Sequence, residues 1–163
     1  MNIIIKNKNT LIYDQFKFKC CLGKNGTSSK KTEGDKKTPV GNYKIGNLFY
    51  RADKNKRPIT KIKCIKIKKN MGWCNDIKSK KYNKLIKINN KIKYEKMYRR
   101  DYKYNFVLPI YYNFEKPISG KGSAIFIHLT KNYKSTAGCI AIKKKDMLIL
   151  LKCINKSSRI IIH

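Results

Sequence analysis

Hydrophobic and polar positions alternate over short stretches of this chain, a pattern typical of half-buried β-strands. Residues 16–20 alternate phenylalanine and cysteine with lysine, and residues 104–112 place large apolar side chains at every second position. The apolar run 123–128, which ends in His128, predicts a buried central strand. Further strands are expected at 40–45, 62–67 and 159–162.

Only two segments favour helices, 91–100 and 146–151. The polar stretch 23–37 predicts a long loop, and 70–83 predicts an ordered one. No repeat or linker divides the chain, so we expect one domain over residues 1–163. The predicted fold is mainly β, a single-domain sandwich or barrel with about two short helices.

Charge dominates the composition. Forty Lys and Arg against nine Asp and Glu give a formal net charge of +31. Such a charge attracts polyanions, yet only five of the forty cations are Arg, the side chain that specific phosphate and base recognition favours. The lysines are also spread along the whole chain. We therefore expect non-specific polyanion binding rather than a dedicated nucleic-acid site.

One histidine and one of the six cysteines are candidates for catalysis. Cys139 follows Gly138 and lies eleven residues after His128, so two adjacent strands would bring thiol and imidazole together. An imidazole that accepts the thiol proton makes the sulfur a nucleophile, and the N–H groups of Gly138 and Cys139 would face an acyl oxyanion. From spacing alone, a hydrogen-bonded core histidine is the commoner arrangement.

The remaining cysteines give no comparable signal. They form no CxxC pair and no zinc-type spacing with histidine, so we expect neither a metal nor another cofactor. Whether any of them form disulfides is left open: Cys20, Cys21, Cys64, Cys74 and Cys153.

Five short motifs occur in a characteristic order. They are EGDKKTPVGNY at 33–43, FYRAD with RPIT at 49–60, MGWCND with YN at 71–83, SAIFIH at 123–128 and TAGCIA at 136–141. Together they resemble the YkuD-type L,D-transpeptidase family, and in particular a subgroup with a W-C-x-D…Y-N segment and a T-x-G-C active-site motif. The resemblance covers the chain from about Phe16 to Ile162.

The resemblance implies an enzyme acting on peptidoglycan stem peptides. Cys139 would attack the carbonyl of the third stem residue, typically a diamino acid, and expel the terminal D-residue of a tetrapeptide. Transfer of the acyl group to an amine of a neighbouring stem would give a 3→3 cross-link. His128 would move the protons, the Gly138 amide would bind the oxyanion, and Thr136 would order the loop.

Five further residues are candidates for binding the stem peptide. Trp73, Asp76, Tyr82 and Asn83 either line the cleft or order a loop, with Trp73 in the core and Asp76 and Asn83 capping turns, and we favour the second interpretation. Arg57 either binds a substrate carboxylate through two parallel hydrogen bonds or is a solvated cation.

Two other functions remain as alternatives. The same site would act as an L,D-carboxypeptidase if water were the acceptor, and a degenerate site would leave a basic module that binds cell wall or nucleic acid. The family's substrate implies a periplasmic or envelope location. Residues 1–15 show no secretory leader, so a cytoplasmic location stays open. No segment is apolar enough to predict a membrane span, and the sequence gives no oligomeric state.

Overall fold

The computed structural model describes residues 1–163 and consists mainly of short strands. The elements in chain order are β1 (Ile3–Lys6), β2 (Thr10–Tyr13), β3 (Phe16–Cys21), β4 (Thr27–Ser28), β5 (Thr38–Pro39), β6 (Gly41–Lys44), β7 (Leu48–Tyr50), β8 (Cys64–Lys66), β9 (Met71–Cys74), β10 (Leu85–Lys87), β11 (Tyr94–Lys96), the 3-10 turn η1 (Lys103–Asn105), β12 (Phe106–Pro109), β13 (Phe126–Leu129), β14 (Ile140–Ile142), α1 (Lys144–Cys153) and β15 (Arg159–Ile162). The mainly β prediction is confirmed.

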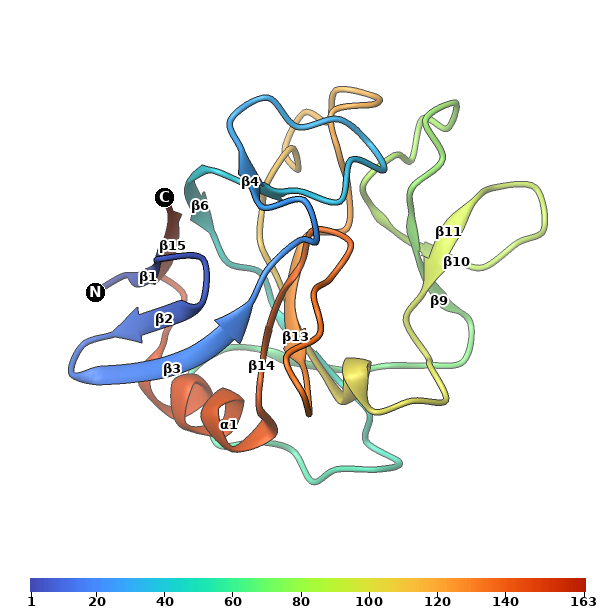
Figure 1. Cartoon of the computed structure of the whole chain (residues 1–163). Helices are drawn as coiled ribbons and strands as arrows, with labels where there is room; N and C mark the ends of the chain where they lie inside the picture. The colour runs from blue at the N-terminus through green and yellow to red at the C-terminus, as the bar shows by residue number, and fades with distance from the viewer.

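Ten of these strands form one mixed sheet in the order β6-β15-β1-β2-β3-β14-β13-β12-β7-β8. The sheet curls into an open half-barrel, and the two chain ends lie close together because β1 pairs in parallel with β15 (Figure 1). A separate three-stranded sheet, β10-β9-β11, projects from the other side of the molecule. Strands from both ends of the sequence, β1 to β3 and β15, lie on one side of the central pair β13 and β14, and β12, β7 and β8 lie on the other side.

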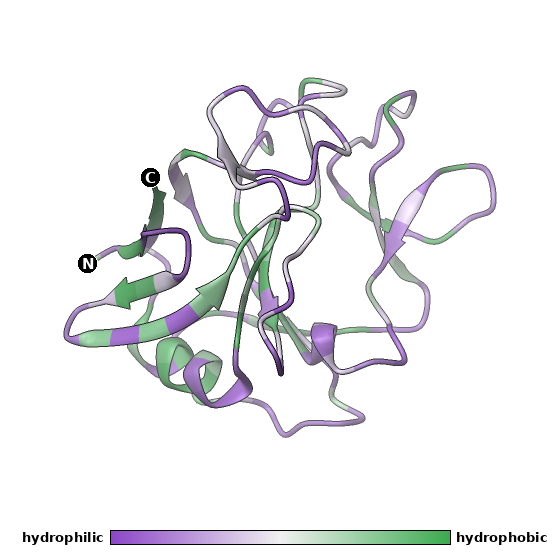
Figure 2. Cartoon of the chain, viewed as in Figure 1, coloured by the Kyte–Doolittle hydropathy of each residue, from purple (hydrophilic) through white to green (hydrophobic).

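The central strands are buried on both faces, which explains their continuous apolar sequence. Ile127 and Ile140 point into the main core with the buried residues of α1, whereas Phe126 and Cys139 belong to a second cluster on the opposite face. Hydropathy colouring shows the same arrangement, with apolar strands at the centre and polar connections around them (Figure 2). The second cluster is the one that bears on function.

Helix α1 confirms the helix expected at 146–151 and extends it in both directions. Met147, Leu150 and Leu151 share one face at helical spacing and are almost completely buried, so the helix is fixed by packing against the sheet. No helix of the structure is long and apolar enough to cross a membrane.

The helix expected at 91–100 is wrong. Tyr94–Lys96 instead form β11, which pairs antiparallel with β9, and the following Met97 is fully buried in the second cluster. Strand pairing and the burial of Met97 outweigh the local helix preference of this segment. The strand expected at 104–112 is shorter than predicted, because η1 occupies its first residues.

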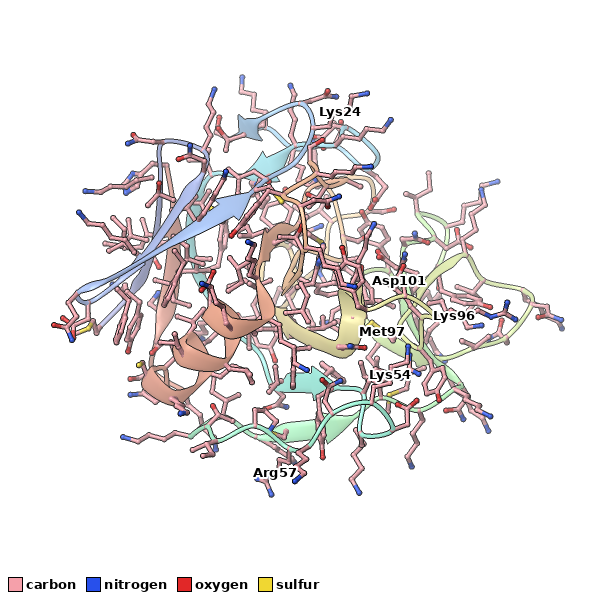
Figure 3. The ribbon with its side chains drawn as sticks, turned by 60° about the horizontal axis from the view of Figure 1, so that its bottom comes forward. Lys24, Lys54, Arg57, Lys96, Met97 and Asp101 are labelled. Carbon is pink, nitrogen blue, oxygen red and sulfur yellow. The ribbon has the colours of Figure 1, made fainter.

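Several strands were not singled out by their pattern. Residues 3–6 and 10–13 form β1 and β2, and the predicted loop 70–83 contains β9. Lysine side chains extend outward around the outline of the molecule, with Lys24 and Arg57 at opposite edges of the view (Figure 3). The positive charge is therefore distributed around the molecule in this view.

Candidate active site

Two adjacent parallel strands position the predicted thiol and imidazole. His128 of β13 is paired with Ala141 of β14, and Cys139 lies two residues before Ala141. Because side chains alternate between the faces of a strand, Cys139 and His128 point to the same face of the sheet. Both side chains line one cavity of about 600 Å³.

The Cys139 thiol is held by main-chain groups. Its Sγ donates to the carbonyl oxygen of Ala124 at 3.2 Å and accepts from the N–H of Phe126 at 3.4 Å. Burial raises the pKa of the Cys139 thiol well above its usual value, and the nearby carboxylate of Glu95 raises it further. The sulfur is therefore a neutral thiol at pH 7, and its proton must leave as it attacks.

His128 is oriented by the next residue of its own strand. Nδ1 lies 3.0 Å from the carbonyl oxygen of Leu129, which assigns the proton to Nδ1 and leaves Nε2 as an acceptor. Burial lowers the pKa of His128 to about 4, with smaller contributions from the charges of Lys103 and Arg99. A neutral imidazole with a free Nε2 has the protonation state of a general base.

Thr136 ties together the turn that carries the cysteine. Its hydroxyl donates to the Cys139 carbonyl at 2.6 Å and accepts the Gly138 N–H at 3.1 Å. Thr38 secures the same turn by donating to the Gly138 carbonyl at 2.9 Å. The loop-ordering role expected of Thr136 agrees with these contacts.

The two amides expected to bind an oxyanion differ in availability. The Gly138 N–H is occupied by Thr136, whereas the Cys139 N–H makes no hydrogen bond within the chain. Gly138 would have to release Thr136 before its amide could bind an oxyanion. Cys139 carries the more available donor.

The cavity also contains charged and aromatic residues that sequence reasoning did not single out. Tyr104 packs its ring against His128 with centroids 5.4 Å apart, and its hydroxyl donates to Glu95. The guanidinium carbon of Arg99 lies 5.1 Å from the centroid of the Tyr104 ring, and Arg99 also forms an ion pair with Asp101. Glu33 and Lys36 had a usable signal, their place in the EGDKKTP motif, whereas Glu95, Arg99 and Tyr104 come from segments whose structure was misassigned.

Lys31 is the most deeply buried charge of the cavity wall. Its Nζ lies 2.6 Å from Oδ1 of Asp35, and the side chain is only 4% exposed. A methyl group built on Gly138 would come within 3.6 Å of this Nζ, so the ammonium lies beside the cysteine turn. The Lys31 charge lowers the pKa of the Cys139 thiol and partly offsets the effect of burial.

None of the five residues expected to contact substrate lines this cavity. Trp73 is buried in the second cluster, and its Nε1–H donates to Asn83 Oδ1 at 2.9 Å. Asn83 also accepts the Ala124 N–H and donates to two main-chain carbonyls. The contacts agree with the packing interpretation favoured for Trp73 and Asn83.

The other three residues lie in different surroundings. Asp76 accepts main-chain N–H groups of Lys78 and Lys93, which is the turn-capping role favoured above. Arg57 is exposed and points outward at the lower edge of Figure 3. Tyr82 reaches the rim of the site indirectly, because its hydroxyl donates to Glu33.

Comparison with known proteins agrees with this geometry. The chain resembles the crystal structure of the helical cell shape determining protein Pgp2 from Campylobacter jejuni and that of a point mutant of the same protein, each with a TM-score of 0.51 and 18% sequence identity. Each match covers 99% of this chain and 47% of the other, so the likeness shows a shared fold over about half of that protein's length. No curated protein sequence matches the chain. Residues 2–162 match the YkuD family, the L,D-transpeptidase catalytic domain, and the chain therefore belongs to that family.

Proposed function

We propose that this chain is a cysteine L,D-transpeptidase that joins peptidoglycan stem peptides through 3→3 cross-links. The observation that carries the proposal is the placement of Cys139 and a neutral, oriented His128 on one face of the sheet, both open to the same cavity. Membership of the YkuD family supports peptidoglycan as the substrate. The reaction would take place in the cell envelope, where that polymer lies.

Acylation begins with the neutral thiol and the neutral imidazole. The Cys139 proton passes to Nε2 of His128 while the sulfur attacks the carbonyl carbon of the third stem residue. The Leu129 carbonyl, already bound to Nδ1–H, stabilises the imidazolium that forms. The negative charge on the substrate oxygen is stabilised by the free N–H of Cys139.

The intermediate then collapses to an acyl-enzyme. His128 returns the proton to the departing amine, the bond to the terminal D-residue breaks, and a thioester to Cys139 remains. An amine from a second stem then attacks the thioester and gives its proton to Nε2. The new amide bond forms as the bond between the acyl carbon and sulfur breaks, and His128 passes the proton to the departing sulfur, which restores the thiol.

The test uses tetrapeptide muropeptides and three proteins: the wild type, Cys139→Ala and a control, Cys153→Ala, which removes a partly buried thiol outside the cavity. We expect the wild type and the control to release the terminal D-residue and form dimers joined between two third residues, as read by mass spectrometry. Cys139→Ala should do neither while keeping the wild-type unfolding temperature. Turnover by Cys139→Ala would overturn the cysteine mechanism.

The products also distinguish the alternatives. Tripeptides without dimers would show that water is the acceptor and that the chain is an L,D-carboxypeptidase. No turnover by the wild type, together with salt-sensitive binding to cell wall or nucleic acid, would instead support a basic binding module.

A further inference from the structure

Lys31 is the only buried lysine of the chain, with 4% of its surface exposed. The other lysines are half-buried or exposed and contribute to the general positive charge of the surface. Taking an ammonium group out of water costs free energy, so lysine is almost never fully buried without a partner. The position of Lys31 beside the candidate nucleophile therefore calls for a physical explanation.

Two glycines leave room for the Lys31 side chain. A Cβ built on Gly122 would lie 2.8 Å from Cε of Lys31, and a Cβ built on Gly138 would lie 3.6 Å from its Nζ. The aliphatic part of the lysine thus passes Gly122, and its ammonium group ends beside Gly138, the residue before Cys139. Lys31 and Cys139 line the same cavity.

The ion pair with Asp35 does not use all the hydrogen-bonding capacity of Lys31. Nζ lies 2.6 Å from Oδ1 of Asp35 and 3.5 Å from the carbonyl oxygen of Thr32, a long and weak contact. Asp35 is also held by the main-chain N–H groups of Thr32 and Lys37, each at 2.9 Å. Because an ammonium group has three N–H donors, Lys31 keeps at least one for a group in the cavity.

The oxyanion site next to Lys31 has only one free main-chain donor. The Gly138 N–H is bound to the Thr136 hydroxyl at 3.1 Å, whereas the Cys139 N–H makes no hydrogen bond within the chain. Preorganised donors aimed at the developing negative charge are usually the largest single contribution to acyl-transfer catalysis. The Lys31 ammonium lies beside Gly138, the residue whose own N–H is already occupied.

We propose that the Lys31 ammonium is the second donor to the oxyanion, which makes Lys31 a catalytic residue in the reaction of Cys139. The inference rests on the proposed function of the same cavity. As the sulfur attacks, the π electron pair of the substrate carbonyl moves onto oxygen, and Lys31 donates a hydrogen bond to that oxygen while keeping its proton. When the pair returns and re-forms the C=O bond, the bond to the departing amine breaks, and the amine takes its proton from His128.

The first experiment measures the release of the terminal D-residue from a tetrapeptide by the wild type and three variants. Lys31→Met keeps an unbranched apolar side chain and removes the ammonium. We expect it to lower kcat about 100-fold and to leave KM nearly unchanged, because the lost interaction is made only with the oxyanion. Lys31→Arg, which keeps a cationic donor, should recover part of kcat. Lys30→Met removes the same charge from the adjacent exposed lysine and should keep the wild-type kcat.

The second experiment needs no substrate. It measures how fast iodoacetamide alkylates Cys139 at a fixed alkaline pH, with the modified peptide identified by mass spectrometry. Burial raises the pKa of the Cys139 thiol, Glu95 raises it further, and Lys31 lowers it. Lys31→Met should therefore slow alkylation, and Asp35→Asn, which removes the counter-charge of Lys31, should speed it. If the ion pair only ordered its loop, both variants would break it and change the rate in the same direction.

The outcomes separate this inference from the proposed function. Wild-type kcat in Lys31→Met, or alkylation rates that change in the same direction in the two ion-pair variants, would overturn the catalytic role of Lys31 and leave the cysteine mechanism intact. If Lys31→Met does not fold, Asp35→Asn still decides, since alkylation no faster than in the wild type would overturn the role. Failure of the wild type to release the D-residue would overturn the proposed function itself, and the alkylation rates would still support or overturn the action of Lys31 on Cys139.

Discussion

Cys139 Sγ and the carbonyl oxygen of Ala124 are joined by a hydrogen bond of 3.2 Å, so the position of the thiol depends on the conformation of Ala124. Ala124 has a left-handed backbone, with φ of 53°. Its N–H is held by Oδ1 of Asn83 at 3.0 Å, and the same oxygen accepts the Trp73 indole N–H. Asn83 therefore supports the candidate nucleophile from outside the cavity.

Replacing Asn83 by alanine should destabilise the protein strongly. The change removes four hydrogen bonds at a residue that is only 3% exposed, and it places alanine at a φ of 57°. Because buried unsatisfied groups each cost about 1–3 kcal/mol, we expect the free energy of unfolding to fall by about 3 kcal/mol or more. Urea denaturation measures this loss.

The control for this change is Asn7→Ala, which tests the backbone strain alone. Asn7 has a similar φ of 51°, is exposed and makes no side-chain hydrogen bond. We expect Asn7→Ala to lower the free energy of unfolding by only about 1 kcal/mol. Equal losses for the two variants would show that the Asn83 hydrogen bonds contribute little.

Gly138→Ala should distort the cysteine turn. Gly138 has a φ of 137°, and an added Cβ would lie 2.8 Å from the carbonyl oxygen of Lys37, a rigid main-chain atom. We expect a loss of stability of about 2 kcal/mol or more and a large loss of D-residue release. Gly26→Ala is the control, since Gly26 has a φ of 79° and nothing lies within 4 Å of the new methyl group. Its loss of stability should be smaller than that of Gly138→Ala, because it comes from backbone strain alone.

Thr136→Val keeps the shape of the side chain and removes its hydroxyl. The Gly138 N–H loses its acceptor, and the Cys139 carbonyl loses a donor at 2.6 Å. We expect unfolding to become easier by about 1–2 kcal/mol and kcat to fall, because the turn that positions the sulfur loosens. Thr136→Ser, which retains the hydroxyl, should behave like the wild type in both assays; wild-type behaviour of Thr136→Val would show that the hydroxyl does not hold the turn.

The local pattern predicted the central part of the fold more completely than its edges. The run 123–128 and the segment around Cys139 are short and apolar because β13 and β14 are buried on both faces. Such a continuous apolar run can be recognised from the sequence alone. The helix predicted at 91–100 is wrong, since strand β11 in this segment is stabilised by pairing with β9. Alternation cannot reveal which distant strand supplies the pairing partner.

The same distinction applies to the candidate site. Cys139 and His128 lie on adjacent strands close in sequence, so their spacing and motif were enough to predict a shared cavity. Glu95 and Tyr104 reach that cavity from the misassigned segments, and no motif marked them. Trp73 and Asn83 were marked by a motif, yet their hydrogen bonds and burial place them in the supporting structure.

The stability of the protein should depend on the protonation of His128 between pH 4 and pH 6.5. Burial lowers the pKa of His128 from its ordinary 6.5 to about 4, so within this range the unfolded chain binds a proton that the folded chain does not. The stabilising contribution of the neutral imidazole is complete above pH 6.5 and is lost as the pH falls towards 4. A shift of this size corresponds to about 3 kcal/mol.

The measurement compares urea denaturation of the wild type and of His128→Gln at a series of pH values. Glutamine does not titrate. As the pH falls from 6.5 to 4, the wild type should therefore lose about 3 kcal/mol of unfolding free energy relative to His128→Gln. Burial also raises the pKa of Glu95, which gives a slope of opposite sign in both proteins and cancels in the difference. A difference that stays constant across this range would show that His128 titrates normally in the folded protein and that burial does not lower its pKa.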